Sequence, residues 1–309
     1  SCTNFKRRFW CNAGKFYLKS LNLKEDYLLA IVNLAILYQN IGKLEDSKKY
    51  YLKAIELSPK RISLYFNLSR IDNNFINDKI IKFLTNLLIN EKQELSEMSF
   101  GYFLLANHER KKKNFKQEID YLKKANLYNF QTMKLANEKT LEYWKKTIVK
   151  KYNNFKFLDE KKNKDLEKLK PIFIIGLPRS GSTITEVLLR ANNKNINSLG
   201  EVSIFNGIIA KGFTNNENNK IDLDYVRNKI LNLLVDKNYN FKNRIFIDKS
   251  LENFFYIDVI LKIFPKAIFI NTTRNIKDNI FAIYKQSLSK LSWTHSIKDI
   301  LEYVDNYLK

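Results

Sequence analysis

Apolar residues follow two different patterns in the two halves of this chain. Between Ile62 and Glu94 they recur at the three- and four-residue spacing that is typical of amphipathic helices. After Pro171 the pattern changes to short apolar runs that alternate with stretches of helical spacing; the runs are Phe173–Ile175, Arg244–Ile247 and Ala267–Asn271. Short buried runs separated by helices are typical of a parallel sheet. The sequence therefore predicts a helical region followed by an α/β region.

One stretch of the helical region is repeated. Lys15–Leu23 aligns with Lys49–Leu57, Ser20 matching Ala54, and this offset of 34 residues is the period of tetratricopeptide repeats. In these helix–turn–helix units, small residues let the paired helices approach and aromatic residues fill the gaps between them. The unit that contains the second copy has the expected residues on its first helix, in its turn, on its second helix and after it: Leu34, Ala35 and Tyr38; Gly42; Ser47, Tyr51 and Ala54; and Pro59.

A later unit, Tyr102–Ala125, carries the same pattern, with small residues at Ala106 and Ala125. We therefore expect residues 1–127 to form a short α solenoid of tetratricopeptide repeats, the first of them shortened. An unrelated helical bundle is the alternative, because the period recurs cleanly only once. Residues 128–169 are predicted to be a further helix and a charged linker, and residues 170–309 a P-loop-type α/β domain that is incomplete at its C-terminal end.

Charge and hydropathy restrict the partners. The chain has 54 Lys and Arg against 32 Asp and Glu, a formal net charge of +22 that favours anionic partners. The basic residues are spread along the chain and match no nucleic-acid-binding motif, so no nucleic acid is expected as a partner. The longest apolar run, Tyr27–Tyr38, is interrupted by Asn33 and is too short to cross a bilayer. We therefore expect no membrane segment in this chain.

Cysteine and histidine are rare. The chain has two of each, Cys2, Cys11, His108 and His295, and their spacing is not that of metal ligands. Two cysteines also cannot build a disulfide framework. The sequence therefore predicts no metal and a reducing compartment, for which the cytoplasm is the expected location.

The most informative motif follows the first apolar run. Gly176–Thr183 has the spacing of a Walker A loop, but Ser182 occupies the position of the lysine. The glycines allow backbone N–H groups to converge on phosphate oxygens at the positive end of the following helix. A P-loop kinase or nucleotide triphosphatase is disfavoured for two reasons. The lysine that this loop lacks neutralises the β- and γ-phosphates in those enzymes. No obvious Walker B acid follows an apolar run either, and Asp248 is the only candidate. We expect the loop to hold a single phosphate of a nucleotide.

Pro178–Thr183, which reads PRSGST, resembles the loop of the tetratricopeptide-containing sulfotransferases and the tyrosylprotein sulfotransferases, which usually reads PRSGTT. The resemblance covers residues 171–309, and the upstream repeats match the architecture of the same family. It continues through four further segments in order: Gly200-Glu201, Ile247–Phe254, Phe264–Ala267 and Thr273-Arg274.

This resemblance implies transfer of a sulfuryl group from 3′-phosphoadenosine-5′-phosphosulfate (PAPS) to an acceptor hydroxyl, and a protein tyrosine is one candidate acceptor. Glu201 would be the catalytic base and Lys249 a lysine near the transferring group. Arg274 would bind the 3′-phosphate of PAPS. The acceptor would be a peptide, a protein or a small hydroxyl compound, and the repeats would contact it or a partner protein. The loop residues implied to bind the 5′-phosphosulfate are Pro178, Arg179, Ser180, Gly181, Ser182 and Thr183.

The chain departs from the family pattern downstream of the loop. Asn275 and Ile276 stand where the family commonly has Asp-Pro, Ala282 stands where it has a serine, and Leu251 replaces a proline. The missing serine removes one expected donor to the 3′-phosphate. These departures leave a second hypothesis open, a non-catalytic interaction protein that works through its repeats and carries a degenerate nucleotide-binding domain.

Overall fold

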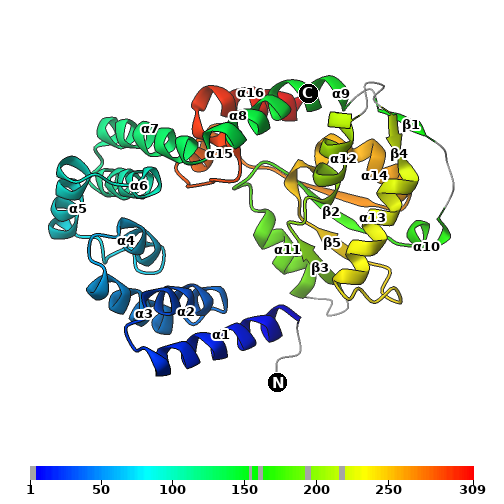
Figure 1. Ribbon diagram of the computed structural model, residues 1–309. Coiled ribbons are helices and arrows are strands. Elements are labelled where there is room, and N and C mark those ends of the chain that lie inside the picture. Colours follow the sequence, from blue (N-terminus) through cyan, green and yellow to red (C-terminus); the bar gives the residue numbers. More distant parts are fainter. Residues whose placement is uncertain (1–4, 153–154, 159–162, 192–195, 216–219) are drawn as a thin grey trace. The chain divides into compact units, whose positions relative to one another are not determined.

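The computed structural model describes residues 5–152, 155–158, 163–191, 196–215 and 220–309 (Figure 1). The chain forms two units: residues 1–134 with 285–289, and residues 135–284 with 290–309. The first unit is helical, and the second combines helices with parallel strands. The helical and α/β regions predicted from the apolar pattern are thus confirmed.

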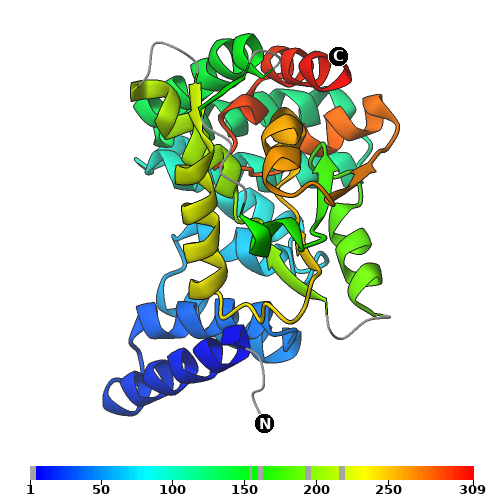
Figure 2. The same ribbon diagram turned by 90° about the vertical axis from the view of Figure 1, so that its right-hand side faces the viewer.

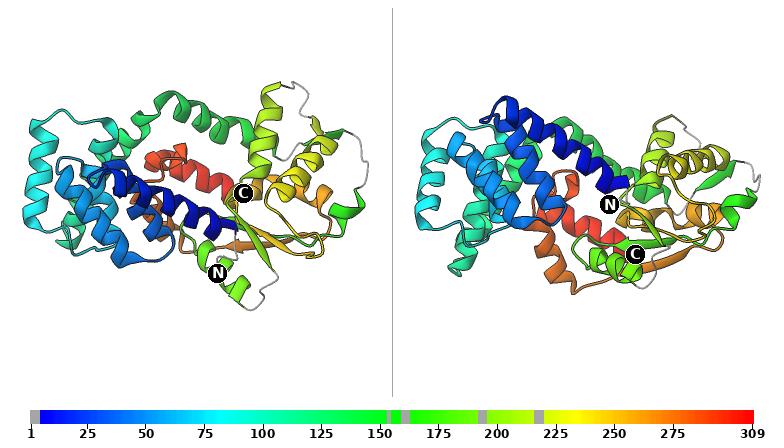
Figure 3. Two further views of the ribbon diagram at one scale, coloured as in Figure 1. Left: turned by 60° about the horizontal axis from the view of Figure 1, so that its bottom comes forward. Right: turned by 90° about the horizontal axis from the view of Figure 1, so that it is seen from below.

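The first unit contains helices that follow one another through short turns. Figure 3 shows them from two further sides, coloured from blue to green. The helices described in this unit are α1 (Phe5–Leu23), α2 (Leu28–Asn40), α3 (Leu44–Leu57), α4 (Ile62–Ser69), α5 (Asp78–Asn90), α6 (Leu95–Lys111) and α7 (Phe115–Thr132).

The pair of α2 and α3 shows why small residues recur where helices meet. Gly42 takes a φ of +81° in the turn, a left-handed conformation that glycine adopts without steric penalty. Ser47 Oγ in α3 donates a hydrogen bond of 2.6 Å to Ala35 O in α2, which requires a close approach of the two helices. Tyr51 and Ala54, also in α3, are fully buried. The small residues that the repeat pattern singles out, Ala35, Ser47 and Ala54, are therefore buried in this helix pair.

The pair of α6 and α7 repeats this arrangement. Ser99 Oγ in α6 donates a hydrogen bond of 2.9 Å to Ala125 O in α7. Lys113 takes a φ of +60° in the connecting turn, where the earlier pair has Gly42. The hairpin of α2 and α3 contains the second copy of the repeat, and the hairpin of α6 and α7 contains the later unit, whereas the first copy, Lys15–Leu23, lies in α1. Stacking of these helices into a solenoid stays a prediction.

No helix in the described part of the chain, in either unit, is both long and apolar enough to cross a bilayer.

The second unit begins with helical turns and continues into the α/β region. Its helical elements are α8 (Lys134–Glu142), the π-helical turn η1 (Tyr143–Thr147), α9 (Ile148–Lys151), α10 (Lys164–Glu167), α11 (Ser182–Ala191), α12 (Ile204–Asn215), α13 (Leu223–Asp236), the 3₁₀ turn η2 (Leu251–Tyr256), α14 (Ile257–Ile263), α15 (Ile276–Tyr284), the 3₁₀ turn η3 (Ser292–His295) and α16 (Ile297–Leu308). Its strands are β1 (Lys156–Leu158), β2 (Ile172–Gly176), β3 (Asn197–Gly200), β4 (Lys220–Asp222), β5 (Phe246–Asp248) and β6 (Ile268–Thr272).

Four of these strands form one parallel sheet in the order β3-β5-β2-β6 (Figures 1 and 2). The three apolar runs correspond to β2, β5 and β6, as predicted. Strand β3 is additional, and so is a separate parallel pair of β1 and β4. Because the strands are parallel, their carboxyl ends meet at one edge of the sheet, where open α/β folds bind ligands.

The two faces of β2 are covered by different helices, because successive side chains of a strand point to opposite sides. Ile172 and Ile174 form a cluster with Ile247 of β5, against which Leu189 of α11 packs. Phe173 points the other way and contacts Phe205 of α12, with ring centroids 5.9 Å apart. Strand β2 is thus buried on both sides, which explains its continuous apolar sequence.

Candidate functional site

The loop between β2 and α11 begins at a glycine that no other residue can replace without strain. Gly176 has a φ of +132°, and a Cβ atom there would lie 2.6 Å from the backbone oxygen of Thr272. This close approach fixes the end of β2 beside β6. Ser180 then closes the loop, because its Oγ donates a hydrogen bond of 2.7 Å to Leu177 O and lies 2.7 Å from Thr272 Oγ1.

The second half of the loop is open towards solvent. Arg179 has a φ of +70° and Gly181 a φ of +103°, and a Cβ atom at Gly181 would meet nothing within 4 Å. Helix α11 begins at the next residue, so unpaired backbone N–H groups of its first turn lie beside this open space. A helix N-terminus next to a glycine of positive φ is a typical anion site. The loop fits a phosphate group on this geometry.

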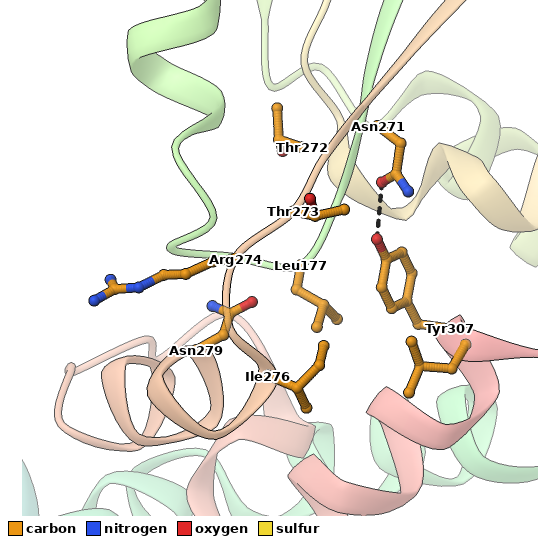
Figure 4. A pocket seen from close by; sticks show the side chains of 9 residues that line it. Leu177, Asn271, Thr272, Thr273, Arg274, Ile276, Asn279 and Tyr307 are labelled. Carbon is orange, nitrogen blue, oxygen red and sulfur yellow. Dashed lines mark hydrogen bonds between the residues drawn. The ribbon is translucent and has the colours of Figure 1, made fainter.

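A cavity of about 230 Å³ lies beside the loop, at the carboxyl end of β6 (Figure 4). Asn279 of α15, which lines this cavity, also contacts the loop, because Asn279 Nδ2 donates a hydrogen bond of 2.6 Å to Pro178 O. Tyr307 OH donates a hydrogen bond of 2.8 Å to Asn271 Oδ1 on the other side. The residues lining the cavity are Leu177, Asn271, Thr272, Thr273, Arg274, Ile276, Asn279, Tyr307 and Leu308.

The two candidate anion-binding arginines are both exposed. Neither Arg179 nor Arg274 forms an ion pair with a residue that the structure describes. In Figure 4 the guanidinium group of Arg274 points away from Tyr307 and from the other labelled side chains. Both cations are therefore available to an anionic ligand at this edge of the sheet.

Lys249 and Glu201, the two candidate catalytic residues, are paired. Lys249 follows β5, its side chain is only 8% exposed, and its Nζ forms an ion pair with Glu201 Oε1. The loop that carries Glu201 is fastened to the end of β5 on both sides. Lys249 N donates a hydrogen bond of 3.0 Å to Gly200 O, and Ser203 N donates one of 2.7 Å to Ser250 Oγ. Glu201 itself is 65% exposed, so its carboxylate reaches solvent while it contacts Lys249.

Asp248, the residue before Lys249, is buried. Burial raises the pKa of its carboxyl to about 6, although the backbone N–H of Ser250 donates a hydrogen bond of 2.8 Å to it. Burial also raises the pKa of Glu252, and the nearby Glu201 adds to that shift. The Asp248 carboxyl closes its own turn among apolar residues that include Phe173. It therefore serves the turn after β5, whereas a Walker B acid would face a metal ion and a phosphate.

The structure links the sequence-predicted residues in two groups. Loop residues 178–183 contact the end of β6 and α15 near Arg274, and Glu201 contacts Lys249. The register of β2 with β5, in which Phe173 pairs with Asp248, puts both groups at the same sheet edge. Four residues at this edge are not singled out by the sequence pattern: Glu186, Ser198, Thr272 and Asn279. Glu186 carries a weak signal, because it lies one helical turn after Ser182 and is the one acidic residue of α11.

Metal ligands are not gathered in the described part of the chain. No group of three or more His, Cys, Asp or Glu residues there is arranged to hold a metal ion. The expectation that the site works without a metal stays a prediction.

Comparison with protein families matches both regions of the chain. Residues 171–308 match the model described as "Sulfotransferase family", so this part of the chain is similar to sulfotransferase domains. Residues 29–61, which include α3 and all but the first residue of α2, match the model described as "Tetratricopeptide repeat". Among individual proteins, the chain is similar to an uncharacterized protein of Aquifex aeolicus (strain VF5), with 22% identity over 308 residues. The alignment covers 91% of this chain and 38% of that protein, so the chain spans well under half of its relative.

Proposed function

We propose that this protein is a sulfotransferase that transfers a sulfuryl group from PAPS to an acceptor hydroxyl. One observation carries the proposal: the sulfotransferase family match covers the phosphate-type loop together with the Glu201–Lys249 pair. A loop without the Walker lysine suits a nucleotide with one phosphate at this point better than a nucleoside triphosphate. The fold alone would not distinguish these ligands.

The loop and the adjoining cavity offer contacts for both ends of PAPS. Arg179 and the backbone N–H groups from Ser180 to Thr183 would bind the 5′-phosphosulfate at the start of α11. Pro178 positions this segment, since its carbonyl is held by Asn279. Arg274, at the rim of the 230 Å³ cavity, would bind the 3′-phosphate.

The chemistry assigned to this chain's side chains is proton removal and charge stabilisation. PAPS supplies an electrophilic sulfuryl group whose bond to the 5′-phosphate breaks as the acceptor oxygen bonds to sulfur. Glu201 takes the proton of the acceptor hydroxyl, so that the oxygen can use its electron pair for attack. Lys249 stabilises negative charge that develops near the transferred group. Glu201 then releases its proton to water.

The acceptor is proposed from the helical region of the chain. A tetratricopeptide repeat supports binding of a peptide or protein, and a tyrosine hydroxyl in such a partner is the acceptor we propose. The competing hypothesis is that the chain is a non-catalytic interaction protein. Ala282 of α15 favours it, because alanine lacks the hydroxyl expected at this position for binding the 3′-phosphate. The two functions differ in whether the chain binds the nucleotide.

Calorimetric titration with 3′-phosphoadenosine-5′-phosphate (PAP), the desulfated product, separates them. We expect the wild type to bind PAP and Arg179→Ala to lose at least about 10-fold in affinity, since a charge-assisted contact contributes ~1.5–3 kcal/mol. Arg190→Ala is the matched control, because Arg190 is exposed at the other end of α11 and should leave affinity unchanged. No binding by the wild type at millimolar PAP would overturn the proposal and favour the non-catalytic protein.

A further inference from the structure

The ammonium group of Lys249 lies between two carboxylates. Glu201 Oε1 contacts it directly, and Glu186 Oε2 lies 3.9 Å from Nζ. Because the Lys249 side chain is only 8% exposed, its charge is largely removed from water. A desolvated ammonium is costly unless an anion stays beside it.

The two carboxylates differ in how they are held. The Glu186 side chain is 14% exposed, against 65% for Glu201. Ser198 Oγ of β3 donates a hydrogen bond to Glu186 Oε1, and the same Oγ accepts one of 3.1 Å from Gly200 N. The Glu186 side chain, which extends from α11, is thus held by β3. Glu201, in contrast, lies in an exposed loop from which it can reach an acceptor.

This difference matters at the step in which Glu201 takes a proton. Before the step Lys249 has two anionic neighbours, and afterwards Glu201 is neutral. Glu186 then remains as the only carboxylate at Lys249 Nζ among the described residues. Without it, no carboxylate would hold the nearly buried ammonium in place after proton transfer, so Lys249 would stabilise the charge on the transferred group less well and the barrier would rise.

We propose that Glu186 is a positioning residue that keeps Lys249 paired and in place while Glu201 acts as the base, and that Ser198 holds Glu186 for this purpose. The inference rests on the proposed sulfotransferase function. It assigns Glu186 no contact with the substrates, so its loss should affect the chemical step and spare nucleotide binding.

Glu186→Gln tests this with two readouts, PAP affinity by calorimetry and steady-state transfer of sulfate from PAPS to a tyrosine-containing peptide. The amide keeps an oxygen that can accept the hydrogen bond from Ser198, so the fold is expected to survive. We expect kcat to fall about 10- to 100-fold, a fraction of the full contribution of a general base. PAP affinity should stay equal or rise, because one negative charge near a polyanion is removed. The KM for the peptide should not change.

Three further variants sharpen the test. Glu186→Asp keeps the charge and should recover part of kcat, and Ser198→Ala should show an intermediate loss. Asp236→Asn removes an equal charge at the exposed end of α13 and should change neither readout. Unchanged kcat in Glu186→Gln with normal PAP binding would overturn the role of Glu186 alone. Loss of PAP affinity in Glu186→Gln would show a structural role instead. Absence of PAP binding by the wild type would overturn both the function and this role.

Discussion

At the scale of single residues, the Glu201–Lys249 pair is where the proposed chemistry is most directly testable. Glu201→Gln removes the base but keeps a side chain of the same size in an exposed position. Sulfate transfer should fall ~10²- to 10⁴-fold, the usual contribution of a general base. PAP affinity by calorimetry should be retained, because the loop and Arg274 are untouched. Transfer at the wild-type rate would show that another group removes the proton.

Asp248 leads to a prediction about stability and pH. Burial raises the pKa of its carboxyl from 3.8 to about 6, so the folded state favours the protonated form. Its contribution to the free energy of unfolding is fully present below about pH 4 and is lost as the pH rises through 6. The difference between a pKa of 3.8 and one of about 6 corresponds to ~3 kcal/mol in the free energy of unfolding.

Asp248→Asn removes this titration while keeping an oxygen for the Ser250 N–H. We therefore expect the stability of the wild type relative to Asp248→Asn to decrease by up to ~3 kcal/mol between pH 4 and pH 7. Urea unfolding of both proteins across that range measures the difference. Parallel pH profiles for the two proteins would mean that Asp248 titrates normally in the folded state.

At the scale of elements, the sequence predicts those parts whose signal is local. Strands β2, β5 and β6 are predicted because buried parallel strands need unbroken apolar runs. The loop is predicted because its glycines are spaced for a backbone turn around a phosphate. Strand β3, which contains Asn197 and Ser198, has no such apolar run, and β1 is a three-residue strand inside a charged stretch.

Contacts between distant segments explain what the sequence does not predict at the site. Thr272 meets Ser180 only because β6 pairs with β2, and Asn279 reaches Pro178 only because α15 follows β6. Glu186 becomes part of the site through Ser198 of β3 and through Lys249, which follows β5 and lies far from α11 in the chain. Such residues require the strand order, which local patterns do not contain.

The junction of β2 with the loop gives a prediction at this scale. Gly176→Ala would place a methyl group 2.6 Å from the backbone oxygen of Thr272, at a φ of +132° that disfavours alanine. We expect the free energy of unfolding to decrease by at least ~1–3 kcal/mol and PAP binding to weaken. Urea unfolding measures the first effect and calorimetry the second.

Gly207→Ala is the matched control, since Gly207 lies in α12 and a methyl group added there would meet no atom within 4 Å. There the substitution should stabilise the protein by ~0.5–1 kcal/mol, the helical preference of alanine over glycine. Equal effects at both positions would mean that the close approach of β2 and β6 imposes no constraint on residue 176.

At the scale of the whole molecule, the two regions support different parts of the proposed function. The α/β region carries the sulfotransferase family match, and the helical region carries a tetratricopeptide repeat. Nucleotide binding and proton transfer are assigned to residues of the first, whereas acceptor choice is proposed for the second. The net charge of +22 belongs to the whole chain and acts on every anionic ligand.

This charge predicts which acceptors are used fastest. With 54 basic against 32 acidic residues, the chain should attract acidic peptides and repel basic ones during encounter. For two peptides of equal length, each with one tyrosine, kcat/KM should favour the acidic peptide by ~10-fold or more at low salt. The ratio should approach one near 1 M salt, where the screening length is only ~3 Å. A preference that does not change with salt would point to specific contacts in an acceptor groove, and no preference at all would show that the excess charge plays no part in acceptor selection.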